Sequence, residues 1–398
     1  MGVHIAGNAA LDGSIAVRRT ALPVPLPPGP HSRPPEAFPA DEYRHRLDGL
    51  RDRLRAARLD AALVVGETNR LYYTGFPASN GLLLVPAEGR PTFFTDFRYL
   101  EAAEAALEFI GCRRLPRRME ALVPPARRRR WHAVGYEGSV VGAARLAAWR
   151  RAFGRKLRFK PLDEAIARQR AVKSPAELAA IRDAVAAADE AFARLLREVR
   201  PGMTEWEIRR RLRMRLDEVG EGEAFPAIVA SGPNSSRCHH SPSLRRWRAT
   251  EPLLIDMGAV VRRYRSDMTR VVFARRPDRR FAQIHRAVLE AQLEGIAALR
   301  AGVSAGRVDA AARRRLGSLA VHFGHGLGHG IGLDIHEAPA LAARRKDVLE
   351  AGMVVTVEPG VYLPGVGGIR IEDVAVVTAD GCEVLTRTPK DLERLIAV

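Results

Sequence analysis

A pattern of two helices followed by strands occurs twice in the second part of the chain, with equivalent positions 100 residues apart. Gly202 ends one predicted helix and Thr204 begins the next, and Gly302 and Ser304 stand at the matching places in the second copy. Glycine favours a helix end and a hydroxyl residue favours a helix start. The repeat predicts a pseudo-twofold α+β domain in which helix pairs cover the sheet and a crevice separates the halves.

The remainder of the chain divides into a tail and a second domain. Residues 1–40 contain eight prolines between 23 and 39, which predicts a flexible Pro-rich tail. Residues 41–165 alternate short apolar runs with helical stretches, which is typical of an α/β domain, and residues 166–398 hold the duplicated domain. The expected strands are 62–65, 81–85, 91–95, 227–230, 253–260, 269–274, 354–358 and 369–377, and the expected helices begin near 41, 99, 143, 174, 204, 278 and 304.

Composition argues against several classes of protein. The net charge is +18, but the arginines are spread along the chain, so we expect a solvated surface and no nucleic-acid partner. The basic run Arg127–Arg130 is expected in a loop. The three cysteines show no CxxC spacing, which favours a reducing cytoplasm. No apolar run approaches the ~20 residues of a membrane span.

Five side chains that bind metals well stand at the ends or edges of predicted strands. They are Asp256, Asp267, His329, Glu358 and Glu372. Four carboxylates brought together repel one another unless cations lie between them, and two divalent ions would balance four such charges. Oxygen ligands with one imidazole suit Mn²⁺, our first expectation, or Co²⁺, Zn²⁺ or Fe²⁺. The set therefore predicts a two-metal hydrolytic centre.

Histidines and an arginine accompany these candidates. His239 and His240 are adjacent in the first half of the domain, and His325 and His336 lie in a glycine-rich segment of the second half. Imidazoles near a metal centre can ligate, stabilise an oxyanion or protonate a leaving amine. If residues 369–377 form one strand, Arg370 and Glu372 share a face of it, so Arg370 could orient the carboxylate or hold a substrate oxygen.

Several phrases resemble one family of enzymes. GHGLGHGIGLDIHEAP, VEPGVYLPG, GIRIEDV and IDMGA…SDMTR are similar to motifs of the pita-bread-fold metallopeptidases, which include aminopeptidase P, prolidase and methionine aminopeptidase. TNRLYYTGF and FFTDFRY resemble the creatinase/prolidase N-terminal domain. The resemblance implies a pita-bread catalytic domain and a proline-directed peptidase that acts on proline-containing peptides, commonly as a homodimer.

The resemblance also implies roles for individual residues. Asp256 would bind one metal, Asp267 and Glu372 would bridge two, and His329 and Glu358 would complete the other. Glu358 would also handle the proton of the attacking water. The histidines given catalytic roles are His239, His325 and His336, and the residues that would line the proline pocket are Tyr362 and Arg370. His239 is chosen over His240, in a Cys238-His239-His240 segment where relatives often have Pro-His-Gly.

Four functions stay open at this point. Our leading expectation is an aminopeptidase that releases the residue before a proline, and the alternative is an Xaa-Pro dipeptidase. A creatinase-like hydrolase would not need these five ligands. A non-catalytic binding protein on the same fold would lack metal, so elemental analysis would separate it from the peptidases.

Overall fold

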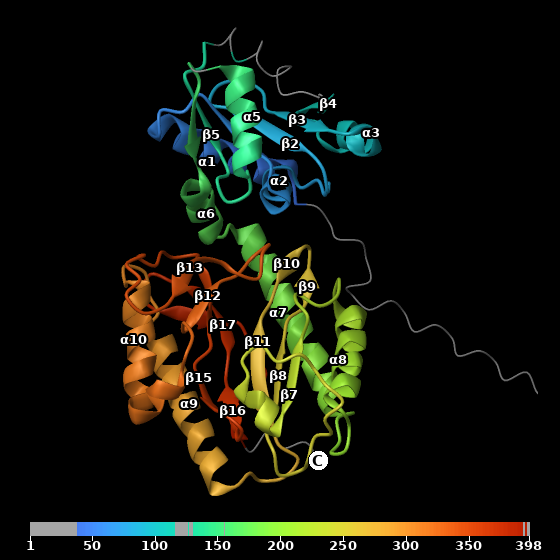
Figure 1. The fold of residues 1–398 in the computed structure, drawn as a ribbon, viewed down its shortest axis with the longest axis vertical. Coiled ribbons are helices and arrows are strands. Elements are labelled where there is room, and N and C mark those ends of the chain that lie inside the picture. The colour runs from blue at the N-terminus through green and yellow to red at the C-terminus, as the bar shows by residue number, and fades with distance from the viewer. Residues whose placement is uncertain (1–37, 116–125, 127–129, 155, 393–394, 396–398) are drawn as a thin grey trace, which may run out of the picture.

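The computed structural model describes residues 38–115, 126, 130–154, 156–392 and 395 (Figure 1). Two domains are stacked along the long axis of the molecule, and one helix leads from the upper domain into the lower one. The Pro-rich segment 1–37 and Arg127–Arg129 lie outside the described residues, so the predictions of a tail and of a loop there stay untested. Among the described residues, no helix combines the length and apolarity needed to cross a membrane.

The N-terminal domain is built on a mixed sheet with the strand order β4-β3-β2-β1-β5-β6. Strand β1 lies antiparallel to β2 and parallel to β5, which agrees with the predicted α/β architecture. Leu47, Leu50 and Leu54 form the buried stripe of the first helix. The elements are α1 Ala40–Ala56, β1 Ala61–Val64, α2 Glu67–Thr74, β2 Leu82–Pro86, β3 Thr92–Thr95, α3 Phe97–Ala106, β4 Gly111–Arg114, β5 Ala133–Tyr136, α5 Ala143–Phe153, β6 Arg158–Pro161 and α6 Asp163–Ala171.

The first half of the lower domain consists of a helix pair and an antiparallel sheet ordered β11-β8-β7. Ser174 and Thr204, where the sequence predicts that helices begin, each form a capping box with the glutamate three residues later. The elements are α7 Pro175–Leu196, α8 Glu205–Val219, β7 Ile228–Ser231, the 3₁₀-helix η2 Gly232–Ser236, β8 Leu253–Met257, β9 Val260–Val261, β10 Tyr264–Arg265 and β11 Met268–Val272.

The second half repeats this plan with a sheet ordered β13-β12-β14-β17-β18. Gly202 and Gly302 both have positive φ, 92° and 82°, and Thr204 and Ser304 both make isolated β-bridges. Ser304 stands at the N-cap of the second helix, as the sequence predicts, but unlike Thr204 it makes no side-chain capping hydrogen bond. The elements are α9 Arg279–Ala297, α10 Ala305–Leu316, the 3₁₀-helix η3 Gly317–His322, β12 Gly328–Gly330, β13 Glu337–Leu341, β14 Val354–Val357, β15 Gly360–Leu363, β16 Gly367–Arg370, β17 Asp373–Val377 and β18 Cys382–Val384.

The prediction of one strand over 369–377 is wrong. Strand β16 ends at Arg370 and pairs with β15, whereas β17 begins at Asp373 and pairs with β14. Between them, the Glu372 N–H donates to the Thr269 carbonyl oxygen at 3.2 Å, which links this connection to the first half of the domain. Glu372 therefore lies where the two halves meet and not on a continuous strand.

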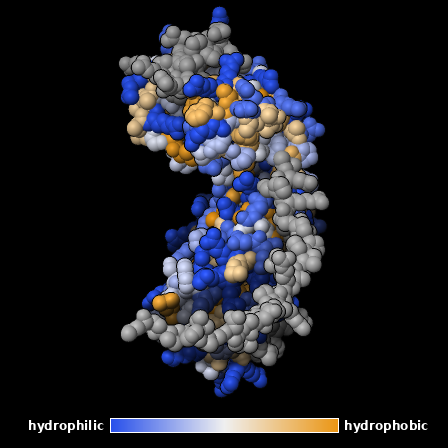
Figure 2. Space-filling model, turned by 90° about the vertical axis from the view of Figure 1, so that its right-hand side faces the viewer, coloured by the Kyte–Doolittle hydropathy of each residue, from blue (hydrophilic) through white to orange (hydrophobic). Residues whose placement is uncertain are grey.

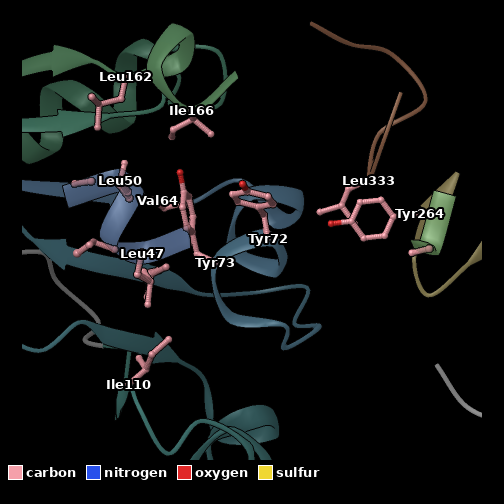
Figure 3. Close-up of a cluster of buried hydrophobic side chains, with 14 of the residues drawn as sticks. Leu47, Leu50, Val64, Tyr72, Tyr73, Ile110, Leu162, Ile166, Tyr264 and Leu333 are labelled. Carbon is pink, nitrogen blue, oxygen red and sulfur yellow. The ribbon is translucent and has the colours of Figure 1, made fainter. Parts of the chain in front are cut away.

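The two domains share a buried apolar cluster. Figure 2 shows them as separate lobes, and the close-up in Figure 3 shows Tyr72 of the N-terminal domain facing Tyr264 and Leu333 of the lower domain. All three side chains are at most 7% exposed. The three cysteines of the chain are unpaired.

Candidate metal centre

Two of the predicted ligands belong to neighbouring strands of the first half, one on β8 and one directly before β11. Asp256 on β8 is directly opposite Thr269 on β11, and Asp267 lies two residues before Thr269. Because side chains two apart share a face of an extended chain, both carboxylates project to one side. Gly258 lets the strands meet this closely, since a Cβ there would overlap the Ser266 carbonyl oxygen.

The other three ligands come from the second half. His329 lies on β12, Glu358 follows β14, and Glu372 joins β16 to β17. His329 Nε2 is 3.6 Å from Asp267 Oδ2 and 3.4 Å from Glu358 Oε1. Ligand atoms of Asp267, His329 and Glu372 lie within 4.8 Å of one another. All five predicted ligands line one cavity of about 520 Å³ between the halves, so the structure brings them together.

The gathered carboxylates make ionisation unfavourable. Burial raises the pKa of Glu358 to about 8. Burial, and then repulsion from neighbouring carboxylates, raises the pKa values of Asp267 and Glu372 well above their ordinary range. Burial also raises the pKa of Asp256, although the Arg370 guanidinium opposes it. Without bound cations this cluster disfavours the folded state at neutral pH.

The side chains present fit divalent cations. Asp256 Oδ1 is buried and has no hydrogen-bond partner among the described residues, so one carboxylate oxygen is available for a cation. His329 Nδ1 is 3.1 Å from the Gly330 carbonyl oxygen, which places the ring proton on Nδ1 and leaves the Nε2 lone pair facing Asp267 and Glu358. Burial lowers the pKa of His329 to about 4, which keeps the imidazole neutral and able to ligate.

A hydrogen-bonded group around Arg370 orients two of the carboxylates. The Arg370 guanidinium donates to Asp256 Oδ2, to Thr269 Oγ1 at 2.9 Å and to the Tyr362 hydroxyl at 3.0 Å. Thr269 in turn donates to Glu372 Oε2 at 2.6 Å. Arg370 is buried, so this single cation acts at low dielectric on several ligands at once.

Tyr362 connects Arg370 to His325. His325 Nδ1 lies 2.8 Å from the Gly326 carbonyl oxygen, so Nε2 accepts a hydrogen bond from the Tyr362 hydroxyl, also at 2.8 Å. Burial, followed by the charge of Arg370, lowers the pKa of His325 to about 4. Burial raises the pKa of Tyr362 above its ordinary value. Both groups are therefore uncharged at neutral pH, with a fixed proton arrangement.

The adjacent histidines occupy different environments. His240 Nε2 is 2.8 Å from Glu205 Oε2, a buried carboxylate that also accepts from Ser243 and Ser231. These contacts fasten both ends of the segment that carries His239. His239, His240 and His336 all line the cavity, and the rings of His336 and His329 are 4.4 Å apart, edge to face. Because the His240 ring is already bound to Glu205, His239 stays our prediction for the histidine that faces a substrate.

Several residues near the site escaped prediction from sequence. Thr269 holds Glu372, and Glu205 holds the histidine segment. Arg209 of α8 lines the cavity while it pairs with Glu223 at 2.8 Å. Thr269 lies two residues after Asp267, so strand periodicity could have indicated it. The other two depend on contacts between distant segments and carry no local signal.

Fold and site together define a two-domain metallopeptidase of the pita-bread type. Residues 179–379 match the model of metallopeptidase family M24, and residues 46–172 match the creatinase/prolidase N-terminal domain. The chain belongs to family M24, as the sequence motifs indicated. Membership of this family implies divalent metal ions.

Relatives match nearly the whole length of the chain. A peptidase of Bacillus subtilis described as uncharacterised is 32% identical over 87% of this chain and 99% of its own. An Xaa-Pro dipeptidase of Pyrococcus horikoshii is 30% identical over 84% and 94%. Among solved structures, an Xaa-Pro dipeptidase from Bacillus anthracis has a TM-score of 0.83 at 34% identity, covering 88% of this chain and 99% of its own. An X-Pro aminopeptidase from Thermotoga maritima has a TM-score of 0.80 at 32% identity, covering 87% and 98%.

Proposed function

We propose that this protein is an Xaa-Pro dipeptidase that hydrolyses the bond before a C-terminal proline. The observation that carries the proposal is the convergence of all five candidate ligands in one cavity of about 520 Å³. That volume is within the range of sites for small molecules, and a dipeptide is a ligand of this size. The Xaa-Pro dipeptidases among its relatives support the same conclusion.

The residues that line the cavity would have different roles in hydrolysis. Two divalent ions held by Asp256, Asp267, His329, Glu358 and Glu372 would activate water and polarise the scissile carbonyl. Glu358, whose pKa is raised by burial, is suited to accept a proton from the attacking water and pass it on. His239 and His336 face the cavity, where they can donate to the developing oxyanion or the leaving amine.

Arg209 supports the choice of a dipeptidase over the aminopeptidase that was our leading expectation. A dipeptidase must hold a free C-terminal carboxylate, and Arg209 places a cation in the cavity wall, where its NH2 group is the one that donates to Glu223. Arg370 is less suited to that task because its Nε, NH1 and NH2 groups already donate to Thr269, Tyr362 and Asp256. The Thermotoga structure keeps an aminopeptidase as the second candidate.

Three finer properties belong to the same proposal. The mainly carboxylate donor set favours Mn²⁺, with Co²⁺, Zn²⁺ or Fe²⁺ as alternatives. We also propose a cytoplasmic homodimer, on the unpaired cysteines and on the resemblance described above. Metal-dependence profiles and sedimentation would test the metal and the assembly.

A substrate series with an arginine variant tests the proposal. The metal-loaded protein is given Ala-Pro, Ala-Pro-Ala and Ala-Ala, and we expect turnover of Ala-Pro far above the other two. Arg209→Met should raise KM for Ala-Pro, while Arg182→Met, which removes an exposed ion pair with Glu383, should leave it unchanged. Faster cleavage of Ala-Pro-Ala than of Ala-Pro would favour the aminopeptidase, and no cleavage of either would refute both.

A further inference from the structure

The segment from Gly330 to Glu337 lies between the metal centre and the N-terminal domain. On one side, Ile335 and His336 line the catalytic cavity. On the other side, Leu333 packs in the apolar cluster shared by the domains, next to Tyr72 (Figure 3). One short segment therefore contacts both the catalytic centre and the other domain.

Ionic contacts fix the residues on either side of His336. Arg170, in the last turn of α6, donates to Asp334 Oδ2 at 2.8 Å and also to Glu337 Oε1. Lys173 Nζ lies 3.4 Å from Glu337 Oε2. Burial raises the pKa of Glu337, but Lys173 and Arg170 outweigh burial and hold it below its ordinary value. Glu337 therefore stays ionised and bound to both cations.

The N-terminal domain supplies further partners of the same segment. Thr68 on α2 donates to Asp334 Oδ1 at 2.9 Å, and Asn69 accepts a hydrogen bond from Arg170 at 2.8 Å. Asp334 therefore accepts one hydrogen bond from Thr68 on α2 and one from Arg170 on α6. The two contacts of Asp334 connect residues more than 160 positions apart, so they restrain the segment strongly.

The backbone of residues 330–337 also leaves room for the Glu337 carboxylate. Gly332 lies against the Glu337 carboxylate, and a Cβ at this position would come within 2.7 Å of Glu337 Oε1. Arg265 donates from its N–H to the Gly332 carbonyl oxygen at 2.9 Å and from its side chain to the Leu333 carbonyl oxygen, also at 2.9 Å. The turn before His336 is therefore folded around the ionised Glu337.

We infer that Arg170 is a positioning residue for His336, and that through it and Thr68 the N-terminal domain sets the geometry of the catalytic centre. Arg170 is not among the residues that line the cavity, and its side chain donates to Asn69, Asp334 and Glu337. Its effect on His336 therefore passes through Asp334 and Glu337. The expected effect of Arg170 on catalysis rests on the proposed function. Its expected effect on the structure, which is to hold residues 330–337 in place, can be measured independently of turnover.

The experiment compares wild type with Arg170→Met, Thr68→Val and the control Arg182→Met, all in metal-loaded protein. Partners around a metal site typically contribute 10- to 100-fold, so Arg170→Met should lower kcat for Ala-Pro by roughly that factor with little change in KM or metal content. Thr68→Val keeps every charge and should lower kcat by about 2- to 10-fold. Arg182→Met should change neither.

Two further readouts distinguish positioning from general instability. Amide hydrogen exchange in 330–337 should be faster in Arg170→Met and Thr68→Val than in wild type, while exchange in α9 stays unchanged. In a His336→Ala background, Arg170→Met should lower kcat much less than it does in wild type, because the residue it positions is gone.

The outcomes separate this inference from the proposed function. Unchanged exchange in 330–337 in both variants overturns the positioning role, whatever the protein hydrolyses. Equal losses of kcat from Arg170→Met with and without His336 also overturn it. If wild type cleaves no Xaa-Pro substrate, the proposed function fails, and the exchange measurement still decides whether Arg170 and Thr68 hold the segment.

Discussion

Replacing Glu358 by glutamine in metal-free protein should stabilise the fold at alkaline pH. Burial raises the pKa of Glu358 from 4.5 to about 8, so the folded state binds a proton that the unfolded state releases. The stabilisation that protonated Glu358 gives the folded state is fully present below pH 4.5 and is lost as the pH rises through 8. A difference of 3.5 between these pKa values corresponds to about 5 kcal/mol lost above pH 8 and roughly 3 kcal/mol at pH 7.

The neutral amide of Glu358→Gln avoids this loss. The variant and wild type should therefore have similar melting temperatures near pH 5 in a chelator. At pH 8 the variant should melt higher, by on the order of 5 to 10 °C for several kcal/mol in a domain of this size. The measurement is differential scanning calorimetry over pH 5 to 8, with and without divalent ions. Bound ions balance the carboxylates, so the advantage of the variant should disappear when metal is restored.

Glu337→Gln is the matched control and should behave in the opposite way. Lys173 and Arg170 lower the pKa of Glu337 despite its burial, so its stabilisation is present at neutral pH and is lost on acidification. This variant should therefore melt lower than wild type by a similar amount at pH 8 and at pH 5, because the stabilisation from Glu337 is lost only as the pH falls below 4.5. An equal shift for Glu358→Gln at pH 5 and 8, or a lower melting temperature at pH 8, would refute the electrostatic account.

The remaining predictions concern the supporting contacts. Asp373→Asn should destabilise the protein by about 3 to 5 kcal/mol in urea unfolding, because Arg270, 2.7 Å from Asp373, would keep a buried charge without its partner. Tyr362→Phe should lower kcat roughly 10- to 100-fold at unchanged metal content, since the hydroxyl connects His325 to Arg370. His239→Ala should lower kcat with little change in melting temperature, whereas His240→Ala should lower stability by about 1 to 3 kcal/mol because Glu205 loses a buried partner.

The duplicated domain and the ligand set could be predicted from sequence because each has a local signature. Thr204 with Glu207 forms a capping box, and Gly302 marks a helix end, whatever the rest of the fold is. The clustering of acids at strand ends indicates cations on charge alone. The proline-directed activity came from the resemblance to a family and not from these patterns.

Features that depend on contacts across the chain could not be predicted in this way. The alternation of Ile369, Arg370, Ile371 and Glu372 resembles one strand, and only the hydrogen bond from Glu372 to Thr269 shows why the chain changes sheets there. The roles of the neighbouring histidines were equally ambiguous. His240 bonds to Glu205, 35 positions away in the sequence, and nothing adjacent to either residue indicates this contact.

The most direct test of the account is a metal titration of Ala-Pro hydrolysis in protein first stripped with a chelator. The account predicts no turnover without metal and a rate that reaches its maximum at two divalent ions per chain. Asp267→Asn or Glu372→Gln should prevent the second ion from binding and remove most of the activity. Full activity in stripped protein, or no Ala-Pro turnover with both ions bound, would contradict a two-metal Xaa-Pro peptidase.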